Sequence, residues 1–391
     1  MQDDSRVFIA GAFEHPTREA PDKSSMQLHA EVARGALEDA GVTKDRVDGY
    51  LTADVPEYEY GLSPLIVADH LGLEVSYVDS TDIGGAAYIS HVGHAASAIR
   101  DGKCDIALIT LAGRPRSRGQ ATGSGTRPLR SMQDSFERIY GVTNLTMYGM
   151  AARRHMYEYG TTPEQLAEIR VAASHHAQFN EHAMYSDPVS VEDVLDSPVV
   201  ANPLHLLDCC VISDGGGALV IVSEEVRDEL DRECVEVLGH GEAPGHHDAG
   251  RIDVTRTAGE RSGARAFDEA GLRPDDIDYA SIYDSFTITV LEAIEDLGFC
   301  EKGEGGQFVE NGALQAPNGM LPFNTDGGGL CNNHPSNRGG MTKVIEAVRQ
   351  LRGEANPEVQ VDANVALAHG TGGSVATRHG AATVILGGAG K

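Results

Sequence analysis

A glycine-rich stretch that carries one histidine is the part of this sequence best suited to chemistry. Residues 324–340 include five glycines, and His334 is followed directly by Pro335, which stiffens the chain. Glycines at this density let the backbone adopt positive φ values and approach a bound group closely. Residues 341–352 continue with apolar side chains at helical spacing. A glycine loop that presents a histidine near a helix N-terminus is suited to holding an anionic or enolate-like oxygen.

The elements that must position this loop are indicated by an internal repeat. Residues 36–50 align with residues 266–280, and five of the fifteen aligned positions are identical. In both copies the pattern predicts a helix end, a glycine stop, an acidic turn and the start of a strand. The glycine stops are Gly41 and Gly271.

Further pairs of segments repeat in the same order. In each copy a glycine loop leads into a predicted helix, then a strand, and later a second strand that begins with glycine. The predicted loop, helix and strands lie at 83–87, 91–100, 105–110 and 216–222 in the first copy and at 324–340, 341–352, 361–368 and 380–386 in the second.

Alternating helices and strands predict an α/β fold with mostly parallel sheets. Repetition of the whole order predicts two similar halves, at about residues 7–222 and 235–386. If the halves pack about a pseudo-twofold axis, the glycine loop at 84–87 faces the loop at 327–334 across one cleft.

Four short motifs then carry a resemblance to a known family. Residues 328–335 resemble the GG-x-x-x-GHP signature of the thiolase superfamily, with Asn333 replacing a glycine. Residues 213–220 resemble its S-D-G-A-x-A-L element, and residues 283–286 resemble its N-E-A-F or H-D-C-F tetrad. Residues 369–373 stand in the place of its final C-x-G-G loop. With the duplication, these motifs identify the chain, over essentially its full length, as a member of this superfamily, similar to its sterol-carrier-protein-type, lipid-transfer-protein-like branch.

The resemblance implies a fold and a domain plan. Thiolases consist of two duplicated βαβαβαββ-type halves in five layers, α-β-α-β-α, with a loop domain inserted in the first half. For this chain the implied plan is an N-terminal half at 1–230 with the insertion at about 113–200, and a C-terminal half at 231–391. A homodimer is expected from the resemblance as well.

The departures from the family pattern bear on the chemistry. The nucleophilic cysteine of thiolases begins the helix after the third strand, and Gly85 takes that position here. His369 replaces the second cysteine, which is the proton donor, and Tyr283 replaces the first residue of the tetrad. Only His334 is kept. Since Gly85 has no side chain, the acyl-enzyme that requires a thiolate cannot form at this position.

What remains is a set of groups suited to an enolate. The backbone N–H of Gly85 and one from the 369–373 loop are expected to hold a thioester oxygen. The expected substrate-binding residues are Gly85, Thr371 and Gly372. The expected catalytic residues are His334, Tyr283 and His369, because histidine and tyrosine can transfer protons. This set fits a retro-aldol cleavage of a β-hydroxyacyl-CoA, the logic of the nucleophile-free steroid side-chain aldolases that the sequence resembles.

Three functions stay open at this stage. The first is a thiolase-fold lyase that cleaves or forms a C–C bond of an acyl-CoA without a cysteine acyl-enzyme. The second is an acetyl-CoA acyltransferase that uses another nucleophile, and the third is a non-catalytic subunit that binds acyl-CoA or lipid. No cofactor is expected beyond the coenzyme A of the substrate. The resemblance also implies a small OB-fold, zinc-ribbon partner protein.

Each candidate also has a structural interpretation. His334 can cap a helix, Tyr283 can be a core residue at a strand end, and His369 can be held in a glycine loop by its hydrogen bonds. The five arginines of residues 113–130 form either a solvated surface or a contact for CoA phosphates. The histidine pairs at 175–176 and 246–247 lack metal-ligand spacing and are expected in solvated turns.

Composition excludes several functional classes. The 391 residues carry 59 acidic and 31 basic side chains, a net charge of −28, which argues against nucleic-acid binding. Only 6 of the basic residues are lysines. This balance is typical of a protein kept soluble in high salt, and we expect a salt-loving host. The sequence has neither an 18-residue apolar run nor the start of a signal peptide, so a cytoplasmic location is expected. Six cysteines without a CxxC pair are expected to be reduced.

Overall fold

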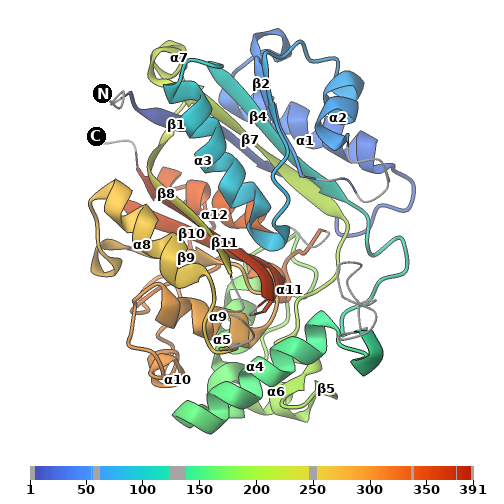
Figure 1. Cartoon of the computed structure of the whole chain (residues 1–391), viewed down its shortest axis with the longest axis vertical. Helices are drawn as coiled ribbons and strands as arrows, with labels where there is room; N and C mark the ends of the chain where they lie inside the picture. The colour runs from blue at the N-terminus through green and yellow to red at the C-terminus, as the bar shows by residue number, and fades with distance from the viewer. Residues whose placement is uncertain are drawn as a thin grey trace.

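The computed structural model describes residues 5–53, 55, 62–123, 138–245, 253–335, 339–375 and 377–388 (Figure 1). Within these residues, the main sheet is mixed and has the strand order β3-β2-β4-β7-β1-β8-β11-β10-β9. Its strands are β1 (Val7–Glu14), β2 (Gly49–Leu51), β3 (Tyr77–Asp79), β4 (Ile106–Gly113), β7 (Gly215–Ser223), β8 (Val235–Gly245), β9 (Tyr279–Ile282), β10 (Val365–Ser374) and β11 (Thr377–Gly387).

The sheet contains the same strand order twice. Outward from β1 the strands are β7, β4, β2 and β3, and outward from β8 they are β11, β10 and β9. The two halves join where β1 pairs antiparallel with β8, with Phe8 opposite Glu236 and Ile9 opposite Val235. The repeated glycine stops also match, since Gly41 and Gly271 both end their helices in the left-handed conformation, with φ values of 68° and 66°. The duplication predicted from the sequence is therefore present in the fold.

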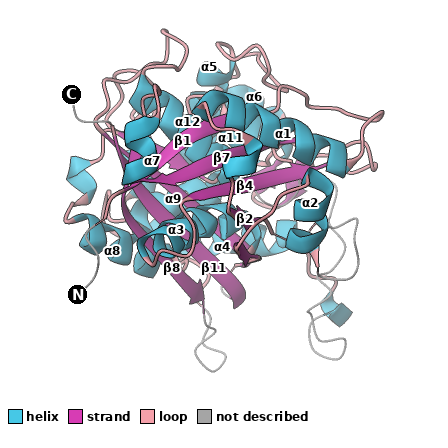
Figure 2. Ribbon diagram, turned by 90° about the horizontal axis from the view of Figure 1, so that it is seen from above, coloured by secondary structure: helices cyan, strands magenta, loops and turns pink. Residues whose placement is uncertain are grey.

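Helices complete a five-layer arrangement (Figures 1 and 2). α1 covers β1, β4 and β7 on one outer face, and α8 covers β8 and β11 on the other. α3 and α12 contact each other and strands of both halves, so they form the middle layer. Ile89 and Val92 of α3 lie in one buried apolar cluster with Val344 and Val348 of α12. The predicted thiolase-like α/β fold is confirmed, but the expectation of mostly parallel sheets is wrong, because five of the eight strand pairs described in the main sheet are antiparallel. The helices of these layers are α1 (Ser25–Ala40), α3 (Ala87–Arg100), α8 (Gly259–Ala270) and α12 (Gly340–Arg352).

The insertion in the first half lies between β4 and β7, so it extends from residue 114 to residue 214, somewhat beyond the predicted end near 200. It packs beneath the second half, where α5 contacts α9 and α11 (Figure 1). Its elements are α4 (Asn144–Tyr159), α5 (Pro163–Ala177), α6 (Val191–Asp196), β5 (Val199–Ala201) and β6 (Leu204–His205). The remaining helices are α2 (Ser63–Leu71), α7 (Glu224–Glu229), α9 (Thr287–Asp296), α10 (Gly305–Phe308) and α11 (Gly328–Cys331).

Two local predictions were wrong. The 369–373 segment is not a loop but the end of β10, because its small residues continue the antiparallel ladder with β11, where Gly372 lies opposite Gly380. His175 and His176 do not lie in a solvated turn. They end α5, and His176 is fully buried, with its Nε2 accepting the N–H of Ala316 at 2.8 Å.

Among the described residues, no helix combines the length and the apolar character needed to cross a membrane.

Candidate active site

A cavity of about 760 Å³ lies where the two halves and the insertion meet. Both halves contribute glycine backbone to its wall, and the insertion contributes the start of α4. Its wall includes Gly84, Gly85, Tyr148, Cys209, Cys210, Tyr283, Ser285, Phe286, His334, Thr371 and Gly372.

The two glycine loops that the repeat relates meet at this cavity. A Cβ atom on Gly340, at the start of α12, would lie only 2.3 Å from the carbonyl oxygen of Gly85. Likewise, a Cβ atom on Gly372 would lie 2.7 Å from the backbone nitrogen of Gly85. Approach this close requires residues without a Cβ atom at positions 340 and 372. The N-terminal ends of α3 and α12 therefore abut at one point on the cavity wall.

Tyr283 and His334 form a hydrogen-bonded pair in this wall. The Tyr283 hydroxyl and His334 Nε2 are 2.7 Å apart, and both side chains are buried. Burial raises the pKa of Tyr283 well above its usual value. Burial also lowers the pKa of His334 to about 4, although the nearby Asp284 carboxylate opposes this effect. At neutral pH the pair is therefore uncharged, a protonated phenol beside a neutral imidazole.

The Tyr283 ring occupies the space above Gly85. A Cβ atom at position 85 would lie 2.6 Å from Tyr283 Cζ and 2.4 Å from the Thr371 carbonyl oxygen. A cysteine at this position therefore cannot coexist with the tyrosine in the observed arrangement. Two departures from the thiolase pattern that the sequence presents separately are one structural change: the phenol fills the volume where the nucleophilic side chain would project.

The loop that carries His334 is anchored by hydrogen bonds and by a buried ion pair. The His334 N–H donates to Ser213 Oγ at 2.9 Å. The Asp284 carboxylate accepts the N–H groups of Gly329 and Leu330 at 2.8 and 3.0 Å. Lys343 Nζ lies 3.0 Å from the same carboxylate, and neither side chain is exposed by more than 1%. This anchoring limits where the His334 ring can lie.

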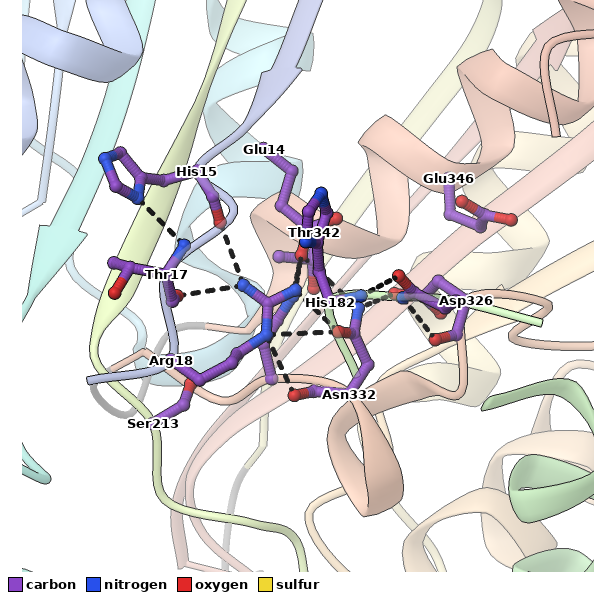
Figure 3. Close-up of polar contacts among 12 residues, drawn as sticks. Glu14, His15, Thr17, Arg18, His182, Ser213, Asp326, Asn332, Thr342 and Glu346 are labelled. Atoms are coloured by element: carbon purple, nitrogen blue, oxygen red, sulfur yellow. Dashed lines mark hydrogen bonds and ion pairs between the residues drawn. The ribbon is translucent and has the colours of Figure 1, made fainter. Parts of the chain in front are cut away.

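A second polar network reaches the same loop from β1 (Figure 3). Arg18 Nη2 donates to Asn332 Oδ1 and to Glu14 Oε1, each at 2.6 Å. Arg349 Nη1 donates to Glu14 Oε2 at 3.0 Å, and Asn332 Nδ2 donates to Asp326 Oδ2 at 2.9 Å. Burial alone would raise the pKa of Glu14, but Arg18 and Arg349 hold it at about 2. Neither Arg18 nor Glu14 carried a recognisable signal in the sequence.

His369 lies apart from the cavity. Its Nδ1 is 2.9 Å from Thr383 Oγ1, and its ring faces Gly259 at the start of α8, where a Cβ atom would lie 3.2 Å from His369 Cε1. Burial lowers the pKa of His369 to about 3. Its carbonyl oxygen accepts the N–H of Tyr283 at 2.8 Å, so its contribution to the pair is made by the backbone. This placement does not support the catalytic role expected for its side chain.

The cavity also contains residues that the sequence reasoning missed. Tyr148 comes from α4 of the insertion, and Cys209 and Cys210 precede β7. No short-range signal connects these positions with the loop at 324–340; only the tertiary fold does. Burial raises the pKa of Cys209 to about 12 and that of Cys210 further, so both remain thiols at neutral pH.

The histidine pairs and the arginine-rich segment contribute little to the site. Within the described ranges, no cluster of three or more histidine, cysteine or acidic residues could hold a metal ion. The pair at 246–247 lies outside those ranges. Of the arginine-rich segment, Ala121 and Gly123 line the cavity, and Arg116 pairs with Glu19 at 3.3 Å. Arg127 and Arg130 lie outside the described residues.

Comparison with known proteins shows similarity to thiolases and to an aldolase. Residues 241–388 match the family described as "Thiolase C-terminal domain-like". "Acetyl-CoA acetyltransferase" of Methanothermobacter thermautotrophicus is 36% identical over 385 residues, which cover 95% of this chain and 97% of that protein. "Steroid side-chain-cleaving aldolase" of Thermomonospora curvata is 34% identical over 367 residues, covering 90% and 91%.

A solved structure described as "Ltp2-ChsH2(DUF35) aldolase" superposes with a TM-score of 0.86 at 31% identity, covering 99% of both chains. The duplicated five-layer fold, the His334 loop and relatives that align over nearly the whole sequence lead to one conclusion: the chain belongs to the thiolase superfamily.

Proposed function

We propose that the protein acts on acyl-CoA thioesters and cleaves or forms a C–C bond by retro-aldol chemistry, without a covalent acyl-enzyme. One observation carries this proposal: the Tyr283 ring, hydrogen-bonded to His334, fills the space above Gly85 that a nucleophilic thiol would need. Similarity to an aldolase over 90% of the chain supports it.

The proposed reaction uses the pair as a proton carrier. The substrate is a β-hydroxyacyl-CoA whose thioester oxygen is held by backbone N–H groups at Gly85 and Gly372. Tyr283 accepts the β-hydroxyl proton while its own proton passes to His334 Nε2. The Cα–Cβ bond then breaks, its electron pair forms the thioester enolate, and the β-oxygen becomes a carbonyl. The pair returns the proton to Cα, so the products are a ketone or aldehyde and a shortened acyl-CoA.

The surrounding charges suit such a carrier. Transfer to His334 creates an imidazolium, and the nearby Asp284 carboxylate raises the pKa of that histidine against the effect of burial. Because Asp284 is itself fixed by Lys343 and two backbone N–H groups, its charge is already in place before the reaction.

The test is a product assay with a panel of β-hydroxyacyl-CoA esters, using mass spectrometry to detect the carbonyl product and the shortened thioester. Tyr283→Phe and His334→Ala are each expected to reduce cleavage by about 100-fold or more, since each removes one member of the proton carrier. Unchanged turnover in both variants would refute the assigned residues. Binding of acyl-CoA without any turnover by the native protein would favour a non-catalytic binding subunit.

An acyltransferase is the second candidate, favoured by the 36% identical acetyl-CoA acetyltransferase and by the two thiols in the cavity. Iodoacetamide alone cannot separate the two functions, because alkylated Cys209 or Cys210 would also block the cavity sterically. The double variant Cys209→Ala/Cys210→Ala removes this ambiguity. We expect it to retain cleavage and to resist iodoacetamide. Complete loss of activity in this folded variant would instead favour a cysteine nucleophile.

We also propose that the enzyme works with a small OB-fold, zinc-ribbon protein and forms a homodimer in the cytoplasm, with no cofactor beyond the coenzyme A of its substrate. The structural relative with the double name Ltp2-ChsH2(DUF35) supports a partner. Co-expression with a neighbouring gene of this type, followed by light scattering of the purified material, tests both assemblies.

A further inference from the structure

A second tyrosine lies in the cavity wall and has no part in the proton carrier. Tyr148, near the start of α4, is 5% exposed. Its ring packs against that of Phe286, with centroids 4.7 Å apart and planes tilted by 31°. Phe286 also lines the cavity. Because the insertion supplies Tyr148 and the second half supplies Tyr283, the two phenols reach the cavity from different parts of the fold.

The Tyr148 hydroxyl lies in a group of hydroxyl-bearing side chains. Thr371 and Ser285 line the same cavity, and both favour the ionised form of the Tyr148 phenol, against the effect of burial on its pKa. Ser285 Oγ is in turn 3.1 Å from Thr289 Oγ1. The cavity wall thus has a second polar site, formed by hydroxyl groups, in addition to the Tyr283–His334 pair. The neighbouring Phe286 ring is apolar. A site of this kind suits an oxygen atom of the ligand.

A buried carboxyl group stands behind this site. Glu292 of α9 is 0% exposed, and neither of its oxygens has a hydrogen-bond partner within the described part of the chain. Burial raises the pKa of Glu292 well above the usual range and so favours its neutral, protonated form. Burial also raises the pKa of Tyr148. Tyr148 therefore keeps its proton and can act only as a hydrogen-bond donor or a neutral acceptor.

We propose that Tyr148 is a further catalytic residue, whose hydroxyl donates a hydrogen bond to the β-oxygen of the substrate. This proposal rests on the retro-aldol function above, in which the β-oxygen changes from a hydroxyl to a carbonyl. Tyr148 stabilises the charge that develops on this oxygen when its proton moves to the Tyr283–His334 pair. Tyr148 keeps its own proton throughout, so the balance of the reaction is unchanged. Ser285 and Thr371 add further hydroxyl groups to the same cavity wall.

Two assays separate this role from that of the carrier. C–C cleavage needs all the groups, whereas exchange of the Cα protons of the shortened acyl-CoA for deuterium in D₂O needs only the carrier and the thioester-oxygen site. For Tyr148→Phe we expect cleavage to fall by about 10²-fold to 10³-fold, as for loss of one oxyanion donor, and exchange to stay within threefold of the native rate. Tyr283→Phe should lose both activities.

Other outcomes decide between the two proposals. Equal loss of cleavage and exchange in Tyr148→Phe, with an unchanged melting temperature, would overturn the β-oxygen role while leaving the carrier intact. Failure of the native protein in both assays would instead count against the proposed function itself.

Two further variants keep the test informative. Tyr50→Phe is the matched control, because Tyr50 is a buried tyrosine bonded to Thr110 at 2.7 Å outside the cavity wall. It should change neither activity, and a loss of cleavage equal to that of Tyr148→Phe would contradict the proposal. Glu292→Gln keeps a neutral side chain and should retain cleavage. Abolished cleavage in a folded Glu292→Gln protein would show that an ionised Glu292 acts on the substrate in place of a neutral Tyr148.

Discussion

At the scale of single residues, the site depends on two side chains that burial keeps neutral. Tyr283 and His334 lie 2.7 Å apart, and both side chains are buried in the cavity wall. In such surroundings a proton can move between them only if the substrate supplies the charge that drives it. Their joint protonation state is therefore the property most directly open to experiment.

The pH dependence of kcat/KM tests this state. His334 must be neutral to accept a proton from Tyr283, and burial lowers its pKa to about 4. We therefore expect kcat/KM for cleavage to be flat from about pH 5.5 to pH 8 and to fall only as the pH drops towards 4. An inflection near pH 6.5 that is absent in His334→Ala would mean that this imidazole titrates in its ordinary range, contrary to the buried arrangement.

Gly85→Ala tests the packing at the same point. The added Cβ would lie 2.6 Å from Tyr283 Cζ, so the ring or the helix start must move. We expect the free energy of unfolding to drop by about 1–3 kcal/mol and cleavage to be lost. Gly380→Ala is the matched control, because its Cβ would meet Ile83 at an ordinary 3.4 Å. Equal activity of both variants would contradict the close packing.

At the scale of elements, buried and half-buried ion pairs fix the helices of the middle layer against strands of the sheet. Asp284 follows β9, and Lys343 belongs to α12, so their 3.0 Å contact fixes the middle layer against the β9 edge of the main sheet. A buried charge that loses its partner is far more costly than the pair itself is stabilising. The position of the His334 loop therefore depends on both charges being present.

Lys343→Met measures this dependence. It leaves Asp284 buried with only backbone N–H donors, and we expect a loss of about 3–5 kcal/mol in the free energy of unfolding by urea. The double variant Lys343→Met/Asp284→Asn removes both charges and should recover part of this loss. If the single and double variants lose equal stability, the cost lies in packing and not in the uncompensated carboxylate.

His94 of α3 joins the two halves of the molecule through two carboxylates. Its Nδ1 is 2.6 Å from Asp79 of β3, and its Nε2 is 3.1 Å from Glu242 of β8. Hydrogen bonds to these two carboxylates raise the pKa of His94 to about 9, and His94 lowers the pKa of Glu242 to about 2. The histidine contribution is complete below its unfolded pKa of about 6.5 and is lost as the pH rises through about 9.

The free energy of unfolding should therefore fall by about 2 kcal/mol between pH 6.5 and 9.5. This figure allows for the partial exposure of His94, Asp79 and Glu242. The variant His94→Gln should remove this fall, measured as urea unfolding at several pH values. His182→Gln, at an exposed histidine 3.8 Å from Glu181, should behave like the native protein. A native stability that is constant across this window would contradict a charged His94.

The sequence predicted the helices, strands and loops better than it predicted the residues of the site. The glycine stops at 41 and 271 could be predicted because a left-handed C-cap is a local requirement. The His334 loop could be predicted because glycine density and a histidine are visible in one stretch. Tyr148 and Arg18 could not, because their roles arise from contacts with segments more than a hundred residues away. His369 was misjudged because whether a strand residue faces the cavity or a helix is set by the sheet.

At the scale of the whole molecule, net charge is the dominant property. Its value of −28 creates self-repulsion that opposes the compact state at low ionic strength. Salt screens these charges, with a Debye length of about 10 Å at 0.1 M and about 3 Å at 1 M. The expectation of a salt-adapted protein is thus a statement about stability that unfolding experiments can test.

We expect the melting temperature to rise by several degrees between 0.05 M and 2 M KCl at pH 7.5. The same titration near pH 4.5, where many carboxylates are protonated, is the internal control and should give a smaller rise. Equal stability in low and high salt at pH 7.5 would remove the case for salt adaptation.

The exclusion between a side chain at position 85 and the Tyr283 ring also constrains the history of the site. In any ancestor with cysteine at position 85, a tyrosine at position 283 would have met that side chain at less than van der Waals distance. Loss of the thiol therefore had to precede or accompany the gain of the phenol. A lineage that lost the thiol first passed through a form with neither group, limited to binding thioesters and polarising them through backbone N–H groups.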